Sequence, residues 1–157
     1  MILSDGEIIE AIKNRQINIS PFDEECLTPN GYDLHIDGIE VDDVMVSWTD
    51  NSYFVKPLSS FRVVSLETVM CDSIHVGILH LKTRYSRRGI QATFGKIDAG
   101  FKGTLAFGLF NGNNKDFELI KGDKIVQIHF EKLGRPAQKL YAQRSGNYQN
   151  QKEKVMK

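Results

Sequence analysis

The strongest constraint on the fold is a series of short β-rich runs that extends from about residue 32 to residue 133. Each run is rich in β-branched or aromatic residues, and turn-forming Pro, Asn, Gly and Asp residues separate many of them. Many short strands with turns between them are typical of an all-β barrel or sandwich. The runs are YDLHI, VMVSW, SYFVK, FRVVSL, HVGILHL, TLAFGLFN, FELI and KIVQIHFEKL.

A short segment near the N-terminus departs from this pattern and predicts a helix. Ser4 stands three residues before Glu7, which is the spacing of a capping box. Ile8 and Ile12 then recur on one helical face, and the pattern ends near Arg15. We therefore expect an all-β fold with one short N-terminal helix.

The chain of 157 residues is long enough for one hydrophobic core and predicts a single domain over residues 1–157. It contains no internal repeat and no segment with the composition of an interdomain linker. The segment from about residue 142 onward is polar. We expect this tail to be mobile unless a ligand or a neighbouring subunit orders it.

Charge and cysteine content exclude several classes of protein. Twenty basic residues balance twenty acidic ones, so no global field favours nucleic acid or an anionic membrane. Cys26 and Cys71 are far apart, which gives no disulfide framework or structural zinc motif. Acidic residues interrupt the N-terminus too early for a signal peptide, and no apolar run is long enough to span a bilayer. We expect a cytoplasmic protein that binds neither nucleic acid nor membrane.

Several common catalytic motifs are absent from the sequence. Zinc nucleobase deaminases need an HxE and a PCxxC element together, and no PCxxC element occurs. No GxxxxGK[ST] or GxGxxG phosphate loop and no GxSxG elbow occurs either. The histidines lie in strand-like segments without metal-ligand spacing, and we expect structural or surface roles for His35, His75, His80 and His129.

The run KTRYSRRGI, residues 82–90, concentrates positive charge. Lys82, Arg84, Arg87 and Arg88 place four cations within seven residues. A solvated basic turn and a polyphosphate clamp both fit this pattern, because Arg and Lys bind phosphate oxygens through charge-assisted hydrogen bonds. A nucleic-acid patch is the third interpretation, and the zero net charge disfavours it.

The run GKIDAGFKGTLAFGLFN, residues 95–111, contains a single carboxylate, Asp98. The next acidic residue along the chain is Asp116. An isolated carboxylate beside apolar strand sequence is costly to bury. Asp98 is therefore a candidate catalytic residue, for a reaction that needs only one acid.

Five segments resemble, in order, the five motifs of the homotrimeric dUTPase and dCTP deaminase superfamily. The opening MILSDGEIIEAIK also resembles the start of archaeal and viral-type members of the deaminase branch. The resemblance implies a distorted β-barrel or jelly roll, assembled as a homotrimer with active sites between subunits. The five segments are NGYDLHI, KTRYSRRGI, GKIDAGFKG, GDKIVQIHFEKL and RSGNYQNQ.

The resemblance implies one of two reactions, and one position separates them. Deaminases of the superfamily carry a water-activating glutamate ten residues after the motif-three aspartate, where this chain has Gly108. Glycine cannot move a proton. The dUTPase reaction needs one aspartate, which activates a water for attack on the α-phosphorus of dUTP, and Asp98 matches it. LFN at residues 109–111 and the short segment before Asp98 also resemble the dUTPase form, so we expect hydrolysis of dUTP to dUMP and pyrophosphate.

The resemblance also assigns roles around Asp98. Backbone groups of residues 93–98 are expected to pair with the uracil edge, which discriminates against cytosine because a donor would then face a donor. Phe101 is expected to stack beneath the deoxyribose. The base- and sugar-binding residues implied are Thr93, Phe94, Gly95, Ile97, Phe101, Tyr141, Tyr148 and Gln151.

A second set of residues is implied to bind phosphate from an adjacent subunit. Asp33, in the first motif, is expected to help hold hydrated Mg²⁺ through water, since Mg²⁺ binds phosphate oxygens while keeping most of its water. The phosphate-binding residues implied are Lys82, Thr83, Arg84, Arg87 and Gln127.

Two departures from the dUTPase pattern keep other functions open. Lys82 replaces the usual Arg, and the tail RSGNYQNQ resembles the deaminase tail rather than the glycine-rich arm of dUTPases. Tyr141, Tyr148 and Gln151 also match deaminase positions. The alternatives are a dCTP deaminase or bifunctional dCTP deaminase/dUTPase, and a catalytically inactive nucleotide-binding regulator.

Overall fold

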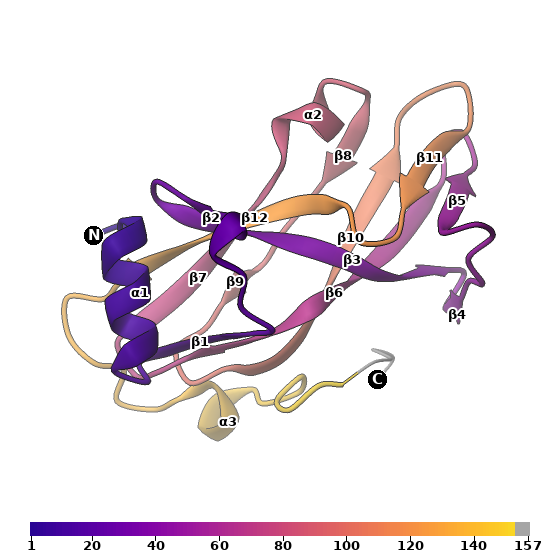
Figure 1. Cartoon of the computed structure of the whole chain (residues 1–157). Coiled ribbons are helices and arrows are strands. Elements are labelled where there is room, and N and C mark those ends of the chain that lie inside the picture. The colour runs from indigo at the N-terminus through magenta and orange to yellow at the C-terminus, as the bar shows by residue number, and fades with distance from the viewer. Residues whose placement is uncertain (153–157) are drawn as a thin grey trace.

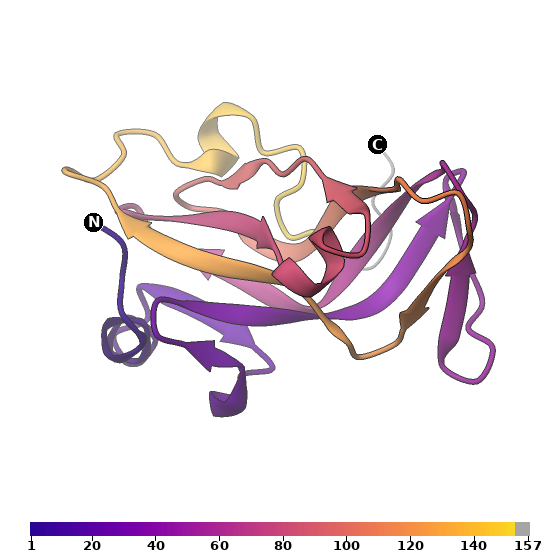
Figure 2. The same ribbon diagram turned by 90° about the horizontal axis from the view of Figure 1, so that it is seen from above.

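The chain folds around one large antiparallel sheet that curls on itself (Figures 1 and 2). The computed structural model describes residues 1–152. The helices are α1 (Asp5–Lys13), α2 (Thr83–Ser86) and α3 (Tyr141–Arg144). The strands are β1 (Ile17–Ser20), β2 (Leu27–Thr28), β3 (Gly31–Val41), β4 (Val44–Met45), β5 (Ser52–Val55), β6 (Ser60–Cys71), β7 (His75–Leu81), β8 (Ile90–Ala92), β9 (Lys96–Ile97), β10 (Lys102–Asn111), β11 (Phe117–Ile120) and β12 (Lys124–Lys132).

The strand order of the large sheet is β8-β10-β6-β3-β12-β7-β9. Strand β1 pairs with β6, and both β2 and β4 pair with β3, while β5 and β11 form a separate two-stranded sheet. The two ends of the order, β8 and β9, are consecutive in the chain but pair with β10 and β7, so the loop at residues 93–95 connects the two ends of the sheet. This arrangement confirms the predicted all-β, barrel-like class with one N-terminal helix.

Each of the eight predicted β-rich runs contains a strand, and four further strands were missed. In the run VMVSW only Val44–Met45 is a strand. The missed strands β1, β2, β8 and β9 are two to four residues long. Such short segments pair because a longer partner strand lies beside them, and local sequence contains little of that information.

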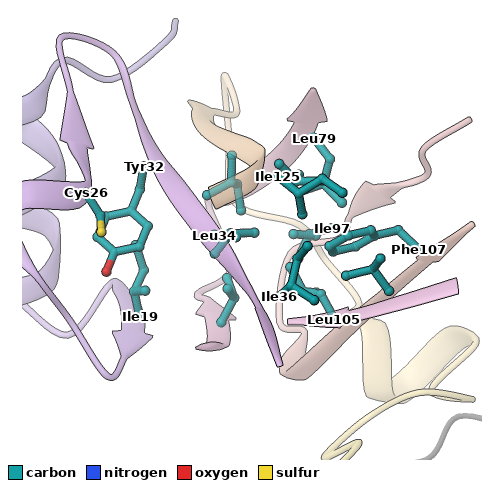
Figure 3. Close-up of a cluster of buried hydrophobic side chains, with 14 of the residues drawn as sticks. Ile19, Cys26, Tyr32, Leu34, Ile36, Leu79, Ile97, Leu105, Phe107 and Ile125 are labelled. Carbon is teal, nitrogen blue, oxygen red and sulfur yellow. The ribbon is translucent and has the colours of Figure 1, made fainter. Parts of the chain in front are cut away.

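The interior of the curled sheet is filled by apolar side chains that alternate along the strands (Figure 3). Tyr32, Leu34 and Ile36 follow one another on the inner face of β3, and each is at most 1% exposed. Ile125 of β12 and Phe107 of β10 pack in the same cluster. This period of two is the signature of a strand with one face against the core.

Helix α1 covers one end of the sheet, beside β1 and β2 (Figure 1). The predicted capping box is confirmed: the Glu7 amide donates to Ser4 Oγ at 3.4 Å, and the Ser4 amide donates to Glu7 Oε2 at 2.8 Å. Ile8 and Ala11 are buried. No helix in residues 1–152 is long and apolar enough to cross a membrane.

The capping box gives a stability prediction. We expect Ser4→Ala to lower the free energy of unfolding by about 1 kcal/mol, because the Glu7 amide loses its acceptor at the helix N-terminus. Ser4→Asp is the matched control, since its carboxylate can accept the same hydrogen bond. Urea denaturation of the three proteins is the measurement, and equal stability of wild type and Ser4→Ala would contradict the assigned cap.

Candidate functional site

Asp98 lies directly after β9, in a turn that is held on both sides. The Gly100 amide donates to the carbonyl oxygen of Cys71, at the end of β6, at 3.1 Å. The Tyr141 amide, at the start of α3, donates to the carbonyl oxygen of Ala99 at 2.9 Å. The position of the Asp98 backbone is therefore fixed by a central strand and by the C-terminal segment together.

The turn requires glycine at its third residue. Gly100 has a φ of +83°, which side-chain-bearing residues rarely adopt. A Cβ at this position would also lie 2.6 Å from the Cβ of Leu140. The glycine of the IDAGFKG run thus allows the tail to pack closely against the turn that carries Asp98.

The Asp98 carboxylate is accessible to a ligand. Its side chain is 41% exposed, and its Oδ1 lies 3.2 Å from the ammonium of Lys96. Exposed ion pairs of this kind contribute little free energy. Asp98 can therefore exchange its contact with Lys96 for a contact with a water molecule or a substrate.

A cavity of about 390 Å³ opens beside Asp98 and along β10. It contains seven of the eight residues predicted to bind base and sugar. The eighth, Phe94, packs edge-on against the cavity residue Phe107, with ring centroids 5.7 Å apart. The lining residues are Arg62, Leu79, Thr93, Gly95, Lys96, Ile97, Asp98, Phe101, Thr104, Leu105, Ala106, Phe107, Gly108, Tyr141, Tyr148 and Gln151.

Aromatic side chains and the C-terminal tail form one wall of this cavity. The rings of Phe101 and Tyr141 meet edge to face, with centroids 5.5 Å apart. The Tyr148 amide donates to the Tyr141 hydroxyl at 3.2 Å. The tail therefore lies on its own chain as far as Gln151, where a short parallel bridge joins it to Gly103.

Gln151 presents an unsatisfied acceptor at the cavity. The Thr104 amide donates to the Gln151 carbonyl oxygen at 2.9 Å, and Gln151 Nε2 donates to the Thr104 carbonyl oxygen at 2.8 Å. Within the described residues, the buried Oε1 of Gln151 has no hydrogen-bond partner. A buried acceptor without a partner costs free energy, so a ligand with an N–H group at this point would be favoured.

The predicted phosphate-binding residues form a second group, outside the cavity. Lys82 makes an ion pair with Asp33, and Gln127 Nε2 donates to Asp33 Oδ1 at 3.2 Å. Thr83 and Arg87 lie nearby on or beside α2, and both are exposed. Among the residues that line the 390 Å³ cavity, none belongs to this group.

The Asp33 carboxylate does not by itself provide a magnesium site. Its side chain is 8% exposed, with one oxygen engaged by Lys82 and the other by Gln127. In residues 1–152 no three His, Cys, Asp or Glu side chains are placed to hold a metal ion together. Magnesium binding remains a prediction of the resemblance.

Sequence reasoning missed the cavity residues contributed by β6, β7 and most of β10. Leu79 and Thr104 carry no distinguishing local signal, since apolar and Thr residues are common in any strand. Arg62 does carry a signal, because it is a charged residue inside the apolar run FRVVSL.

Tyr85 anchors the basic segment to the body of the protein. Its buried hydroxyl donates to Asp123 Oδ2 at 2.9 Å and accepts from Arg84 Nη2 at 2.9 Å. Burial first, and then the hydrogen bond to Asp123, raise the pKa of Tyr85 to about 12, although Arg84 acts in the opposite direction. The folded protein therefore favours the protonated phenol.

This shift predicts an alkaline stability effect. Because the folded pKa of Tyr85 lies above the value of about 10 for an unfolded tyrosine, its contribution is complete below pH 10 and is lost as pH rises toward about 12. We expect wild type to be more stable than Tyr85→Phe at pH 8, and the difference to shrink by pH 11. Denaturation at several pH values measures it, and a difference that does not change with pH would contradict the assignment.

Comparison with known proteins places this site in a family context. The dCTP deaminase-like family model matches residues 39–133. A dCTP deaminase from Thermococcus kodakarensis is 34% identical over 154 residues, which are 97% of this chain and 94% of the relative. A relative from Sulfolobus islandicus rod-shaped virus 1, named a probable deoxyuridine 5′-triphosphate nucleotidohydrolase, is 26% identical over 97% of this chain and 95% of its own length.

Solved structures of a deaminase and of a dUTPase share the fold of this chain. The crystal structure of 2′-deoxycytidine 5′-triphosphate deaminase from Agrobacterium tumefaciens superposes with a TM-score of 0.69 and 17% identity. It covers 85% of this chain, which spans about half (48%) of that solved chain. The Staphylococcus bacteriophage 80alpha dUTPase, solved with dUpNHpp, gives a TM-score of 0.55 and 16% identity, and covers 78% of this chain and 86% of its own.

Proposed function

The chain belongs to the dCTP deaminase-like family, and from that membership we propose that it is a dUTP nucleotidohydrolase, which converts dUTP to dUMP and pyrophosphate. One observation carries the proposal: among the described residues, Asp98 is the only Asp or Glu that lines the 390 Å³ cavity. Gly108, which lines the same cavity, occupies the position where the resemblance implies a glutamate in the deaminases. The cavity therefore has the acid that phosphoanhydride hydrolysis needs and lacks the one that deamination needs.

The proposed reaction uses Asp98 as a general base. The carboxylate accepts a proton from a water molecule while the water oxygen forms a bond to the α-phosphorus. The bond from the α-phosphorus to the bridging oxygen of the β-phosphate breaks, and its electron pair leaves with pyrophosphate. The accessible position of Asp98 at the rim of the cavity fits this role.

The remaining cavity residues fit a deoxyuridine. The loop at residues 93–95 offers backbone groups to a pyrimidine edge, and Gln151 Oε1 offers an acceptor to the uracil N3–H. Phe101 and Tyr141 provide an apolar surface for the sugar. In this arrangement a 2′-hydroxyl would be placed against Phe101 without a hydrogen-bond partner, which disfavours ribonucleotides.

Two cations of the same chain, Arg62 and Lys96, line the cavity, and both are paired with carboxylates, so a triphosphate requires further cations. We propose that Lys82, Thr83, Arg84, Arg87 and Gln127 of a second subunit supply them in a homotrimer, and that Mg²⁺ arrives with the phosphates. The separation of this group from Asp98 within one chain supports a site shared between subunits. A triphosphate would then compete with Asp33 for the ammonium of Lys82.

Deamination is the second candidate, because curated relatives are named dCTP deaminases. It would require a base that the cavity of this chain lacks. Glu40, in the neighbouring cavity, is 3% exposed and accepts a hydrogen bond from Arg62 Nε at 2.8 Å, so it is already committed to a cation. A nucleotide-binding regulator without turnover would keep the cavity and form no product.

The first test is the chemistry of Asp98. We expect wild type to form dUMP and pyrophosphate from dUTP, and Asp98→Asn to lower turnover by at least about 100-fold, because an amide cannot accept the proton. Affinity for a nonhydrolysable imido analogue of dUTP should stay within about tenfold, since the shape is preserved. Ion-pair chromatography of the products and calorimetric binding are the measurements.

Asp116→Asn is the matched control for this test, because Asp116 is an exposed carboxylate paired with Lys56 at 2.9 Å and is remote from the cavity. It should keep wild-type turnover. Near-wild-type activity of Asp98→Asn would refute the assigned base, and dUTP formed from dCTP by wild type would favour the deaminase.

The second test concerns Gly108. A Cβ at this position meets nothing within 4 Å, so Gly108→Ala should keep its activity on dUTP. Gly108→Glu should lower it by about tenfold or more, because a carboxylate in the cavity is desolvated and occupies space beside the base. Time courses with dUTP and dCTP are the measurement, and full activity of Gly108→Glu would show that the substrate does not pass this position.

A further inference from the structure

A smaller cavity adjoins the one beside Asp98. It has a volume of about 260 Å³, and the two cavities share Lys96, Asp98 and Tyr141. Thr93 and Gly95, whose backbone groups are proposed to face the base, line only the larger cavity. A nucleotide with its base at that end would therefore have the smaller cavity beyond its Asp98 end.

Backbone hydrogen bonds fix the apolar wall of the smaller cavity. The Leu133 amide donates to the Ile74 carbonyl oxygen at 2.8 Å, and the Ala137 amide donates to the Ser73 carbonyl oxygen at 2.7 Å. These bonds connect the segment after β12 to the turn before β7. Leu133 and Ala137 line the cavity together with Val76 of β7, so this wall is part of the folded sheet structure.

The rest of the lining is basic. Lys96, Lys139 and Arg144 line the smaller cavity, and Asp98 is the only Asp or Glu among the described lining residues. Asp98 pairs with Lys96 at 3.2 Å, whereas within residues 1–152 neither Lys139 nor Arg144 is paired with a carboxylate. Charges of one sign beside apolar walls concentrate the electric field and attract a counter-ion, so this cavity is suited to an anion.

These cations are separate from the basic segment of residues 82–90. Arg144 belongs to α3, and Figure 1 shows α3 far from α2, which lies in the basic segment. One chain therefore carries two groups of cations. The first lies beside its own Asp98, and the second is remote from it.

Resting on the proposed function, we propose that the 260 Å³ cavity binds the pyrophosphate that leaves the α-phosphorus, through Lys139 and Arg144 of the same chain. The basic segment of a second subunit holds the triphosphate of the substrate, and this cavity receives the product after the bond breaks. Lys and Arg bind phosphate oxygens through charge-assisted hydrogen bonds. Cations at the place where a leaving group gains negative charge also favour the breaking of its bond.

Lys96 connects the two cavities and couples the base to the leaving group. Its ammonium lines both cavities and pairs with Asp98 in the absence of a ligand. In the proposed step the Asp98 carboxylate accepts a proton, so the ion pair loses its negative partner. The pyrophosphate gains negative charge in the same reaction, and the ammonium is then attracted toward it.

The test measures binding of inorganic pyrophosphate and of dUMP by calorimetry, with the assembled full-length protein. We expect Lys139→Ala and Arg144→Ala each to weaken pyrophosphate binding by about tenfold, as loss of a charge-assisted hydrogen bond predicts, and to leave dUMP binding within about twofold. Lys139→Arg keeps the charge and should retain most of the affinity. Arg135→Ala is the matched control, because Arg135 is an exposed cation of the same segment that does not line the cavity.

Three results would overturn the inference: no binding of pyrophosphate by wild type, equal losses in Arg135→Ala, or losses in Lys82→Ala with normal binding in Lys139→Ala and Arg144→Ala. The last result would assign the product to the basic segment. Calorimetry does not need turnover, so the two proposals are separable. A wild type that forms no dUMP from dUTP would remove the proposed function, whereas pyrophosphate binding that depends on Lys139 and Arg144 would still establish the site.

Discussion

The amide of Gly100 donates to the carbonyl oxygens of Cys71 and Asp72, at 3.1 and 2.9 Å, and the arrangement of the site depends on these two hydrogen bonds. They connect the turn after β9 to the end of β6, an inner strand of the sheet. They also set the direction in which β10 begins, and Phe101 at that point is buried. Asp98 and the aromatic wall of the cavity are therefore positioned by the same two hydrogen bonds.

Electrostatics divides the candidate site into two parts. The cavity beside Asp98 has one carboxylate and several apolar side chains in its lining, whereas Lys82 and Arg84 of the basic segment lie outside it, paired with Asp33 and Asp123. A nucleoside triphosphate has a similar division, with base and sugar at one end and about four negative charges at the other. This cavity offers a good environment for the first end only, which is the physical basis of the proposal that a second subunit completes the site.

The sequence contained enough information for the fold class and for the residues that lie within contiguous motifs. Period-two alternation predicted the long strands, and the Ser4–Glu7 spacing predicted the cap of α1, because both effects are local. Thr93, Gly95, Ile97 and Asp98, which line one cavity, could be predicted together, since one short segment of the chain contains all of them.

The rest of the site could not be predicted from local sequence. Arg62 reaches the cavity only because β6 pairs with β10 in a register that places it opposite Gly108. That register depends on core packing and on an irregularity between Thr104 and Ala106, and neither is written in the residues around Arg62. The short strands β8 and β9 were missed for a related reason, since each is defined by its partner.

Base selection under the proposed function can be argued from one position of the ring. Uracil presents a donor at N3, and cytosine presents an acceptor there. The buried Oε1 of Gln151 is an acceptor without a hydrogen-bond partner among the described residues, and its amide is held by the Thr104 carbonyl oxygen. An amide that is held in this way cannot turn its donor toward the wrong base without breaking its own hydrogen bond, so cytosine would leave Oε1 unsatisfied. The proposed hydrolysis of dUTP needs no carboxylate at position 108, and the glycine found there agrees with that proposal.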